Sequence, residues 1–81
     1  MAENGNILDS IRELKAQEPF ARFAIVMNSG ERYVIEAPQN LVEMRTEFFY
    51  AFPRSDRFVL MRITQISSVE RLERGRTAKR R

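Results

Sequence analysis

The sequence predicts a small, mainly β domain in which one N-terminal helix precedes about five short strands of a strongly bent antiparallel sheet. Residues 20–69 hold short apolar runs that alternate from side to side, which is the period of β-strands. Turn-forming residues separate these runs at Asn28-Ser29-Gly30, Pro38-Gln39-Asn40 and Pro53-Arg54-Ser55-Asp56. The residues before Pro19 repeat their apolar positions at helical spacing instead.

The helix is predicted over residues 6–18. Asn6 suits the N-cap position, because its side chain can accept a hydrogen bond from a backbone N–H of the first turn. The apolar residues at helical spacing are Ile7, Leu8, Ile11 and Leu14. Pro19 disfavours helical geometry at Glu18 and ends the helix. About three turns are too few to be stable alone, so we expect this helix to pack on the sheet.

Residues 20–36 predict an antiparallel hairpin. Phe23, Ile25 and Met27 fall on one face of its first strand. Asn28-Ser29-Gly30 tolerates positive φ and predicts a tight turn. The second strand, 32–36, ends before Pro38, which cannot donate to a central ladder. The residues from Pro38 to Asn40 are then either a loop or the bend of one long curved strand.

Residues 41–52 predict a single long strand with one solvated side. Its apolar face would hold Val42, Met44, Thr46, Phe48, Tyr50 and Phe52. Glu43, Arg45 and Glu47 fall on the other face. Phe49 interrupts that polar side, so the sheet must be covered on both faces around it.

The last two strands are predicted at 58–63 and 65–70. Apolar residues occupy both faces of the first of them, and a chain of 81 residues buries only about 60–65% of its unfolded surface. Two apolar faces are hard to cover in so small a domain without a second subunit. We therefore expect a homo-oligomer whose interface is formed by Phe58, Val59, Leu60, Met61 and Ile63.

The composition argues against an enzyme. With no Cys and no His, the chain has neither disulfides nor Ser–His or Cys–His pairs, and a zinc site is not expected. The glycines are isolated, so no phosphate-binding loop is present. Glu43 and Glu47 are interpreted as solubilising residues rather than as an acid–base pair. We expect no cofactor, no metal and no small-molecule substrate.

Charge is distributed unevenly along the chain. Residues 1–70 carry eight Lys/Arg against ten Asp/Glu, whereas residues 71–81 carry six Lys/Arg against one Glu. The predicted organisation is a flexible N-terminus at 1–5, one domain at 6–72 and a basic disordered tail at 73–81. The tail is either a solvated terminus or a site for phosphate contacts. The candidate phosphate-binding residues of 71–81 are Arg71, Arg74, Arg76, Lys79, Arg80 and Arg81.

Aromatic residues of the strands could offer stacking platforms for unpaired bases. These are Tyr33, Phe48, Phe49, Tyr50 and Phe52. Alternating aromatics in strands more often form the core, and Phe49 and Tyr33 are the best candidates for exposure.

From Asn6 to about Leu72, the order and length of these elements resemble the Sm-like fold of the bacterial Sm-like RNA chaperone family (Hfq). Residues 48–52 are similar in position to the apolar third strand of that family. Residues 58–63 and 66–69 are similar in position to its fourth and fifth strands. The resemblance implies a five-stranded barrel that forms rings, in which the fourth strand pairs with the fifth strand of a neighbour.

Two segments depart from that family. Leu60-Met61-Arg62 stands where the family has a Tyr-Lys-His run beside its RNA-contacting pore, so the resemblance assigns a nucleic-acid contact to Arg62 alone. Ile35-Glu36-Ala37-Pro38 replaces the glycine of the second strand. The chain also resembles a set of short uncharacterised bacterial proteins that share a Pro-Phe-x-x-Phe-x-Ile…Gly-x-x-Tyr pattern. The matching residues are Pro19-Phe20-Ala21-Arg22-Phe23-Ala24-Ile25 and Ser29-Gly30-Glu31-Arg32-Tyr33.

Two functions follow as hypotheses. The first is non-enzymatic nucleic-acid binding, with single-stranded RNA as the partner. The alternative is a structural or protein-interaction module that oligomerises through its last strands. Binding of the tail to an anionic membrane ranks third, because the tail has no apolar anchor. Residues 1–5 lack signal-peptide features, and the longest apolar run, 23–27, is far below the roughly 18 residues of a membrane span. A cytoplasmic location without membrane insertion is therefore predicted.

Overall fold

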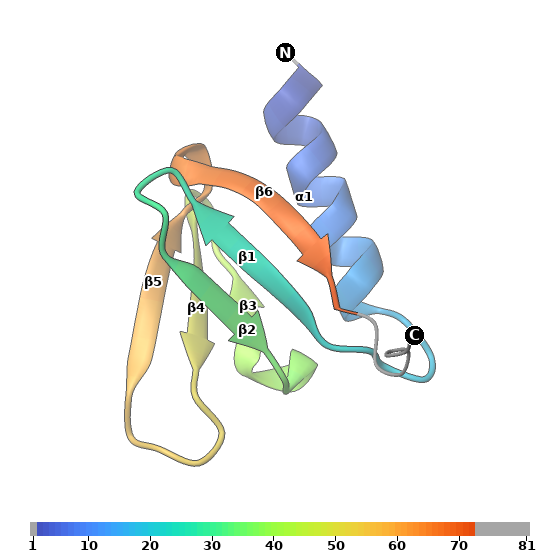
Figure 1. Cartoon of the computed structure of the whole chain (residues 1–81), viewed down its shortest axis with the longest axis vertical. Coiled ribbons are helices and arrows are strands. Elements are labelled where there is room, and N and C mark those ends of the chain that lie inside the picture. The colour runs from blue at the N-terminus through green and yellow to red at the C-terminus, as the bar shows by residue number, and fades with distance from the viewer. Residues whose placement is uncertain (1, 73–81) are drawn as a thin grey trace, which may run out of the picture.

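The computed structural model describes residues 2–72, and within them the chain is mainly β, with one helix and six strands in two antiparallel sheets (Figure 1). The elements are α1 (Ala2–Lys15), β1 (Phe23–Met27), β2 (Arg32–Ile35), β3 (Leu41–Glu43), β4 (Glu47–Ala51), β5 (Phe58–Arg62) and β6 (Ile66–Arg71). Two short 3₁₀ turns, η1 (Pro38–Asn40) and η2 (Ile63–Gln65), complete the chain.

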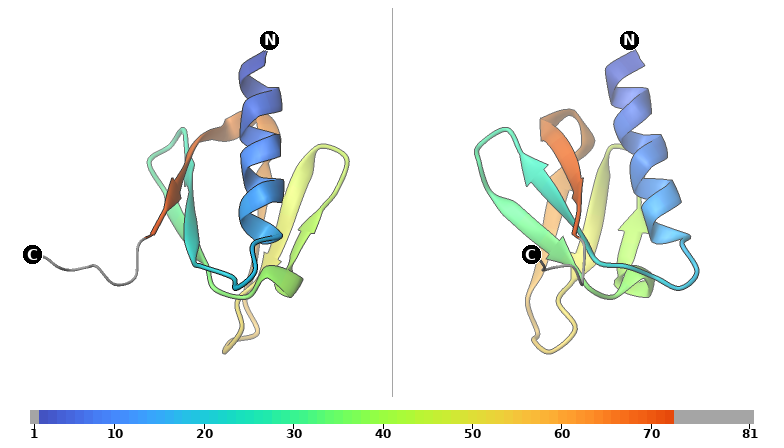
Figure 2. Two further views of the ribbon diagram at one scale, coloured as in Figure 1. Left: turned by 90° about the vertical axis from the view of Figure 1, so that its right-hand side faces the viewer. Right: turned by 45° about the vertical axis from the view of Figure 1, so that its right-hand side comes forward.

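The two sheets have the strand orders β2-β1-β6 and β3-β4-β5. The chain passes between them at the 3₁₀ turns, because η1 joins β2 to β3 and η2 joins β5 to β6. Figure 2 shows the sheets as two layers, with α1 lying across the space between them. We call β2-β1-β6 the first sheet and β3-β4-β5 the second sheet.

The hydrophobic core lies between the two sheets and beneath α1. The helix contributes Ile11 and Leu14, which are buried as the spacing predicts. The fully buried strand residues of this cluster include Phe23, Ile25, Ile35, Leu41, Phe48, Tyr50 and Met61. A short helix thus gains its stability from tertiary packing.

The helix begins earlier than the sequence predicts. It starts at Ala2, so Asn6 lies inside α1 and is not its N-cap. Alanine has the highest helix propensity of all residues, which favours a start at this position. The helix ends at Lys15, before the predicted stop at Glu18.

The β1–β2 hairpin is confirmed. Phe23 pairs with Ile35 and Ile25 with Tyr33. The turn closes through Gly30, which has a φ of 98° and whose N–H donates to the Met27 carbonyl at 2.9 Å. The segment after β2, for which two alternatives were open, forms the 3₁₀ turn η1 between the two sheets.

The predicted single strand over residues 41–52 is wrong. It is a hairpin of β3 and β4, closed where the Met44 N–H donates to the Glu47 carbonyl at 2.8 Å. Because the chain reverses here, Leu41 lies opposite Tyr50 and is buried. Val42, which the alternation places in the core, is 47% exposed.

Candidate functional site

The second sheet has an outer surface with an apolar centre. Residues directly opposite each other on antiparallel strands point to the same side, and Phe49 lies opposite both Val42 and Leu60. Their neighbours Phe48 and Tyr50 are buried and point to the core. The outer face therefore consists of Val42, Glu47, Phe49, Ala51, Phe58, Leu60 and Arg62.

Large apolar side chains on this outer face are exposed. The relative exposure is 59% for Phe58, 50% for Leu60 and 47% for Val42, and the adjacent Met44 is 46% exposed. Single exposed apolar residues are ordinary, but a contiguous apolar patch on a small protein is typical of an interaction site.

Two aromatic rings of the outer face stack on each other. Phe49 and Phe58 are diagonal neighbours on β4 and β5. Their rings stack with centroids 5.3 Å apart and planes at 24°. The Phe58 ring stays largely exposed in this arrangement, with a relative exposure of 59%.

Strand β5 is also an edge strand. Among the described residues it pairs with β4 alone, and in Figure 1 it runs along the margin of the molecule. Its sequence, Phe58–Arg62, contains no proline and one charged residue, Arg62; charged residues and proline protect many natural edges from pairing. Within residues 2–72, no strand pairs with the outer side of β5.

The structure divides the five residues that the sequence assigns to an oligomer interface. Met61 and Ile63 are buried in the core of the chain itself, and Val59 packs partly against that core. Phe58 and Leu60 share a face, as the alternation predicts, and the structure shows that this is the outer face. Only these two of the five present large exposed apolar surfaces.

The structure describes two of the predicted nucleic-acid contacts, Arg62 and Arg71. Arg62 ends β5 on the outer face, opposite Glu47, and Arg71 ends β6 in the first sheet. Both side chains are exposed. The other predicted contacts, Arg74, Arg76, Lys79, Arg80 and Arg81, lie outside the described residues, as does the predicted tail 73–81.

An ion pair that the sequence did not reveal joins α1 to β3. Arg12 donates from Nε to Glu43 Oε1 at 3.0 Å and from Nη2 to Glu43 Oε2 at 2.6 Å. The hydrogen bonds from Arg12 lower the pKa of the Glu43 carboxyl below its usual value, against a smaller opposing effect of desolvation. Glu43 is thus a docking residue for the helix as well as a surface charge.

Of the aromatic candidates for base stacking, Phe48 and Tyr50 belong to the core. Tyr33 is partly buried, and its hydroxyl donates to the Glu31 carboxylate at 2.7 Å. This hydrogen bond, with some desolvation, raises the pKa of Tyr33. Phe52 is also partly buried, with its ring edge-on to Tyr50. Phe49 is therefore the aromatic of this set that belongs to the outer face.

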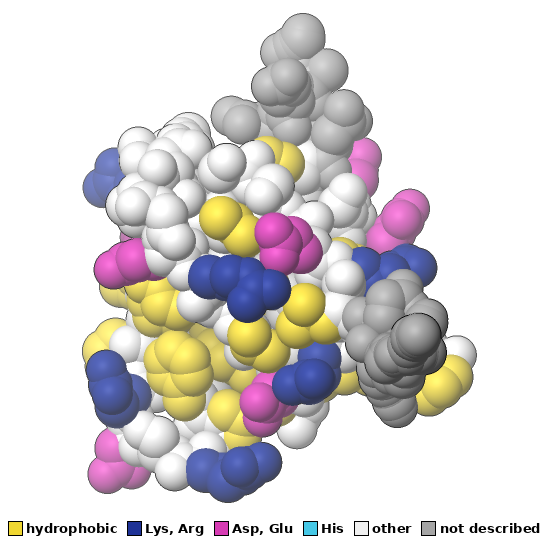
Figure 3. All heavy atoms as spheres, viewed as in Figure 1, with side chains coloured by type: hydrophobic (Ala, Val, Ile, Leu, Met, Phe, Trp, Pro, Cys, Tyr) yellow, Lys and Arg dark blue, Asp and Glu magenta, His cyan; other side chains and the backbone are white. Residues whose placement is uncertain are grey.

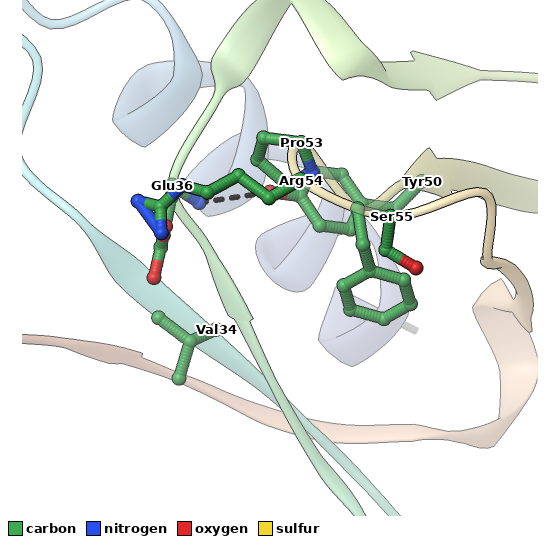
Figure 4. Close-up of a pocket in the computed structure, with 7 residues that line it drawn as sticks. Val34, Glu36, Tyr50, Pro53, Arg54 and Ser55 are labelled. Carbon is green, nitrogen blue, oxygen red and sulfur yellow. Dashed lines mark hydrogen bonds and ion pairs between the residues drawn. The ribbon is translucent and has the colours of Figure 1, made fainter.

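A shallow pocket of about 200 Å³ lies between β2 and the turn after β4. The pocket is lined by Val34 of β2, by Glu36 just after this strand, by Tyr50 of β4 and by residues 52–55 (Figure 4). At its rim the Arg54 guanidinium lies 3.9 Å from the Glu36 carboxylate, so these two charges pair with each other. On the face of the molecule shown in Figure 3, hydrophobic side chains gather in the lower half, with Lys and Arg side chains among and around them.

Other kinds of site receive no support from residues 2–72. They contain no cluster of three or more His, Cys, Asp or Glu side chains placed to hold a metal ion. Nor does this part of the chain have a helix with the length and apolar character that a membrane crossing requires. Comparison of the chain with protein-family models, curated proteins and solved structures returned no match.

Proposed function

We propose that this chain is a non-enzymatic interaction module that self-associates through β5 and the outer face. The observation that carries the proposal is the coincidence of two features in one strand. Phe58 and Leu60 are large apolar side chains that are exposed to solvent. They lie on a strand whose outer edge has no partner among the described residues.

The physical gain from covering this strand is large for a small domain. Full burial of a Leu or Phe side chain contributes about 1.5–3 kcal/mol, and about half of each side chain is still available for burial. Each copy in an assembly would contribute both side chains. Backbone hydrogen bonds along the edge would add directionality, as in other cases of strand addition.

The fold proposed for this module is Sm-like. If β2 and β3 are the two halves of one strand broken at Pro38, the chain has one helix and five strands, in the order that the resemblance implies. The position of η1 between the halves and of η2 before the last strand supports this assignment. That family also assembles through its fourth strand, which corresponds to the strand before η2, although its partner there is the fifth strand of a neighbour.

Light scattering on the full chain tests the proposed function. The wild-type protein is expected to have a mass of at least two chains. Leu60→Glu should reduce the mass to that of one chain, because burial of an unpaired carboxylate at the centre of the interface is energetically unfavourable. Ser10→Glu, which adds the same charge on the exposed side of α1, is the matched control and should leave the mass unchanged. A wild-type protein that is monomeric at all concentrations contradicts the proposal.

A second candidate function, binding of single-stranded nucleic acid, is favoured by one feature of the outer face. Arg62 and the stacked Phe58 ring lie on the same outer face, at opposite ends of β5. Proteins that bind single strands combine exposed aromatic rings with basic residues along one surface. The basic residues of 73–81 would add sequence-independent attraction.

Binding of short single-stranded RNA at two salt concentrations tests this candidate. Affinity should fall steeply with salt, and Phe58→Ala should weaken binding at both concentrations. Undetectable binding, or affinity that salt does not change, rules it out.

A further inference from the structure

The self-association proposed above leaves open which strand pairs with β5, and the sequence of β5 narrows the choice. The strand runs Phe58-Val59-Leu60-Met61-Arg62, with Leu60 at its centre. If β5 pairs antiparallel with its own copy over its full length, Leu60 lies opposite Leu60 of the copy. In the same register Phe58 lies opposite Arg62 of the copy, and Arg62 opposite Phe58.

This register is self-complementary. Phe58, Leu60 and Arg62 all belong to the outer face, so each opposed pair lies on one side of the joined sheet, as antiparallel pairing requires. Each Arg62 guanidinium would lie beside a Phe58 ring, where cation–π attraction is favourable. The two arginines would be at least about 13 Å apart, because four residues of strand separate their positions.

The joined sheet would also align the apolar centres of the two outer faces. Phe49 lies opposite Leu60 within one chain. Across the two-fold axis the row would read Phe49, Leu60, then Leu60 and Phe49 of the copy. Leu60 would thus gain an apolar neighbour on the side that is now open to solvent.

The other sheet edges are β2, β3 and β6; β6 is the longest of them, and its chemistry fits β5 less well. The exposed side chains of β6 include Ser67, Ser68 and Glu70, and Glu70 already binds Arg32 at 3.0 Å. In addition, α1 packs against β6 (Figure 1). Pairing there would place Phe58 and Leu60 opposite polar side chains.

We propose that the partner of β5 is β5 of a second copy, paired antiparallel about a two-fold axis through Leu60. The result is a dimer in which two three-stranded sheets form one continuous sheet with a shared outer face. This inference rests on the proposed self-association and names its partner and its register.

Single cysteines test the register, because the chain has no cysteine of its own. Opposite residues of an antiparallel pair have Cα atoms about 4.5–5.5 Å apart, which lies within the Cα distance range of disulfides. Leu60→Cys is therefore expected to convert most of the full-length protein to a covalent dimer under mild oxidation. Phe58→Cys and Arg62→Cys should each stay largely uncrosslinked, whereas the double variant Phe58→Cys/Arg62→Cys should crosslink. Ser10→Cys on α1 is the control for collisions.

The outcomes separate this inference from the proposed function. A light-scattering mass of two chains together with crosslinking at Leu60→Cys supports the two-fold pairing. A mass above two chains, or a dimer in which Leu60→Cys crosslinks no better than Ser10→Cys, overturns the pairing but leaves self-association in place. A wild-type monomer overturns both.

Discussion

Arg12 on α1 holds the carboxylate of Glu43 on β3 through two hydrogen bonds, 3.0 and 2.6 Å long. The two residues are far apart in sequence, and the pair connects the helix to the strand that borders the second sheet. Ile11 and Leu14 attach the same helix to the core. The ion pair therefore adds a polar contact to a helix that apolar packing already holds on the sheets.

Loss of this ion pair should loosen the docking of α1 without unfolding the sheets. Arg12→Ala is expected to lower the midpoint of urea unfolding by a small amount, because the pair is partly open to solvent and such pairs contribute little. Glu13→Gln, an exposed change on the same helix, is the control. Equal midpoints for Arg12→Ala and Glu13→Gln would contradict a docking role.

The same pair predicts a dependence of stability on pH. Because the folded-state pKa of Glu43 lies below its usual value of 4.5, the pair stabilises the fold above that pH and loses its effect as the pH falls through the folded-state pKa. The difference in unfolding free energy between wild type and Glu43→Gln should thus shrink on acidification from pH 7 to pH 3. Urea titrations at several pH values measure it, and a constant difference would refute the interpretation.

The hydroxyl of Tyr50 closes the bend between the sheets. It accepts from the N–H groups of Glu36 and Ala37, at 3.0 and 3.3 Å, and its side chain is fully buried. Tyr50→Phe leaves these two donors without that partner and should destabilise the fold by about 1–3 kcal/mol. Tyr33→Phe removes a hydroxyl whose hydrogen bond is exposed and should cost less than about 0.5 kcal/mol. Calorimetry or urea unfolding distinguishes the two, and equal losses would contradict the account.

Substitution of Gly30 should affect stability through backbone conformation alone. Its φ of 98° is one that L-residues rarely adopt, while an added Cβ would meet no atom within 4 Å. Gly30→Ala should therefore destabilise the hairpin by about 1 kcal/mol through backbone strain alone. Ser29→Ala is the control in the same turn. An unchanged stability of Gly30→Ala would show that the turn relaxes to negative φ.

The alternation of apolar and polar residues predicted the strands within which the chain does not reverse. It predicted the hairpin at Gly30, and it placed Leu60 and Met61 on opposite sides of β5 without showing which side faces the core; Leu60 is exposed and Met61 is buried. It failed at Met44-Arg45-Thr46, where the chain reverses without a glycine or proline. Because the alternation of residue types continues through that turn, the sequence pattern concealed the turn and placed Val42 on the wrong side.

The interactions that the sequence could not reveal are those between distant segments. Neither the binding of Arg12 to Glu43 nor that of the Tyr50 hydroxyl to the end of β2 follows from any local pattern. The outer face is a similar case. Only the register that places Phe49 between Val42 and Leu60 shows that their side chains form one surface, although the need for cover around Phe49 was evident from its neighbours.

The most direct measurement for the central claim is amide hydrogen exchange of β5 in the full chain at low and high protein concentration. Antiparallel pairing with a second strand would place the backbone N–H groups on the outer side of β5 in hydrogen bonds. Amide exchange within 58–62 should therefore slow as the protein concentration rises. Exchange within β1, which is paired on both sides, should not change. Rates for β5 that are independent of concentration would contradict the claim that its edge binds another copy.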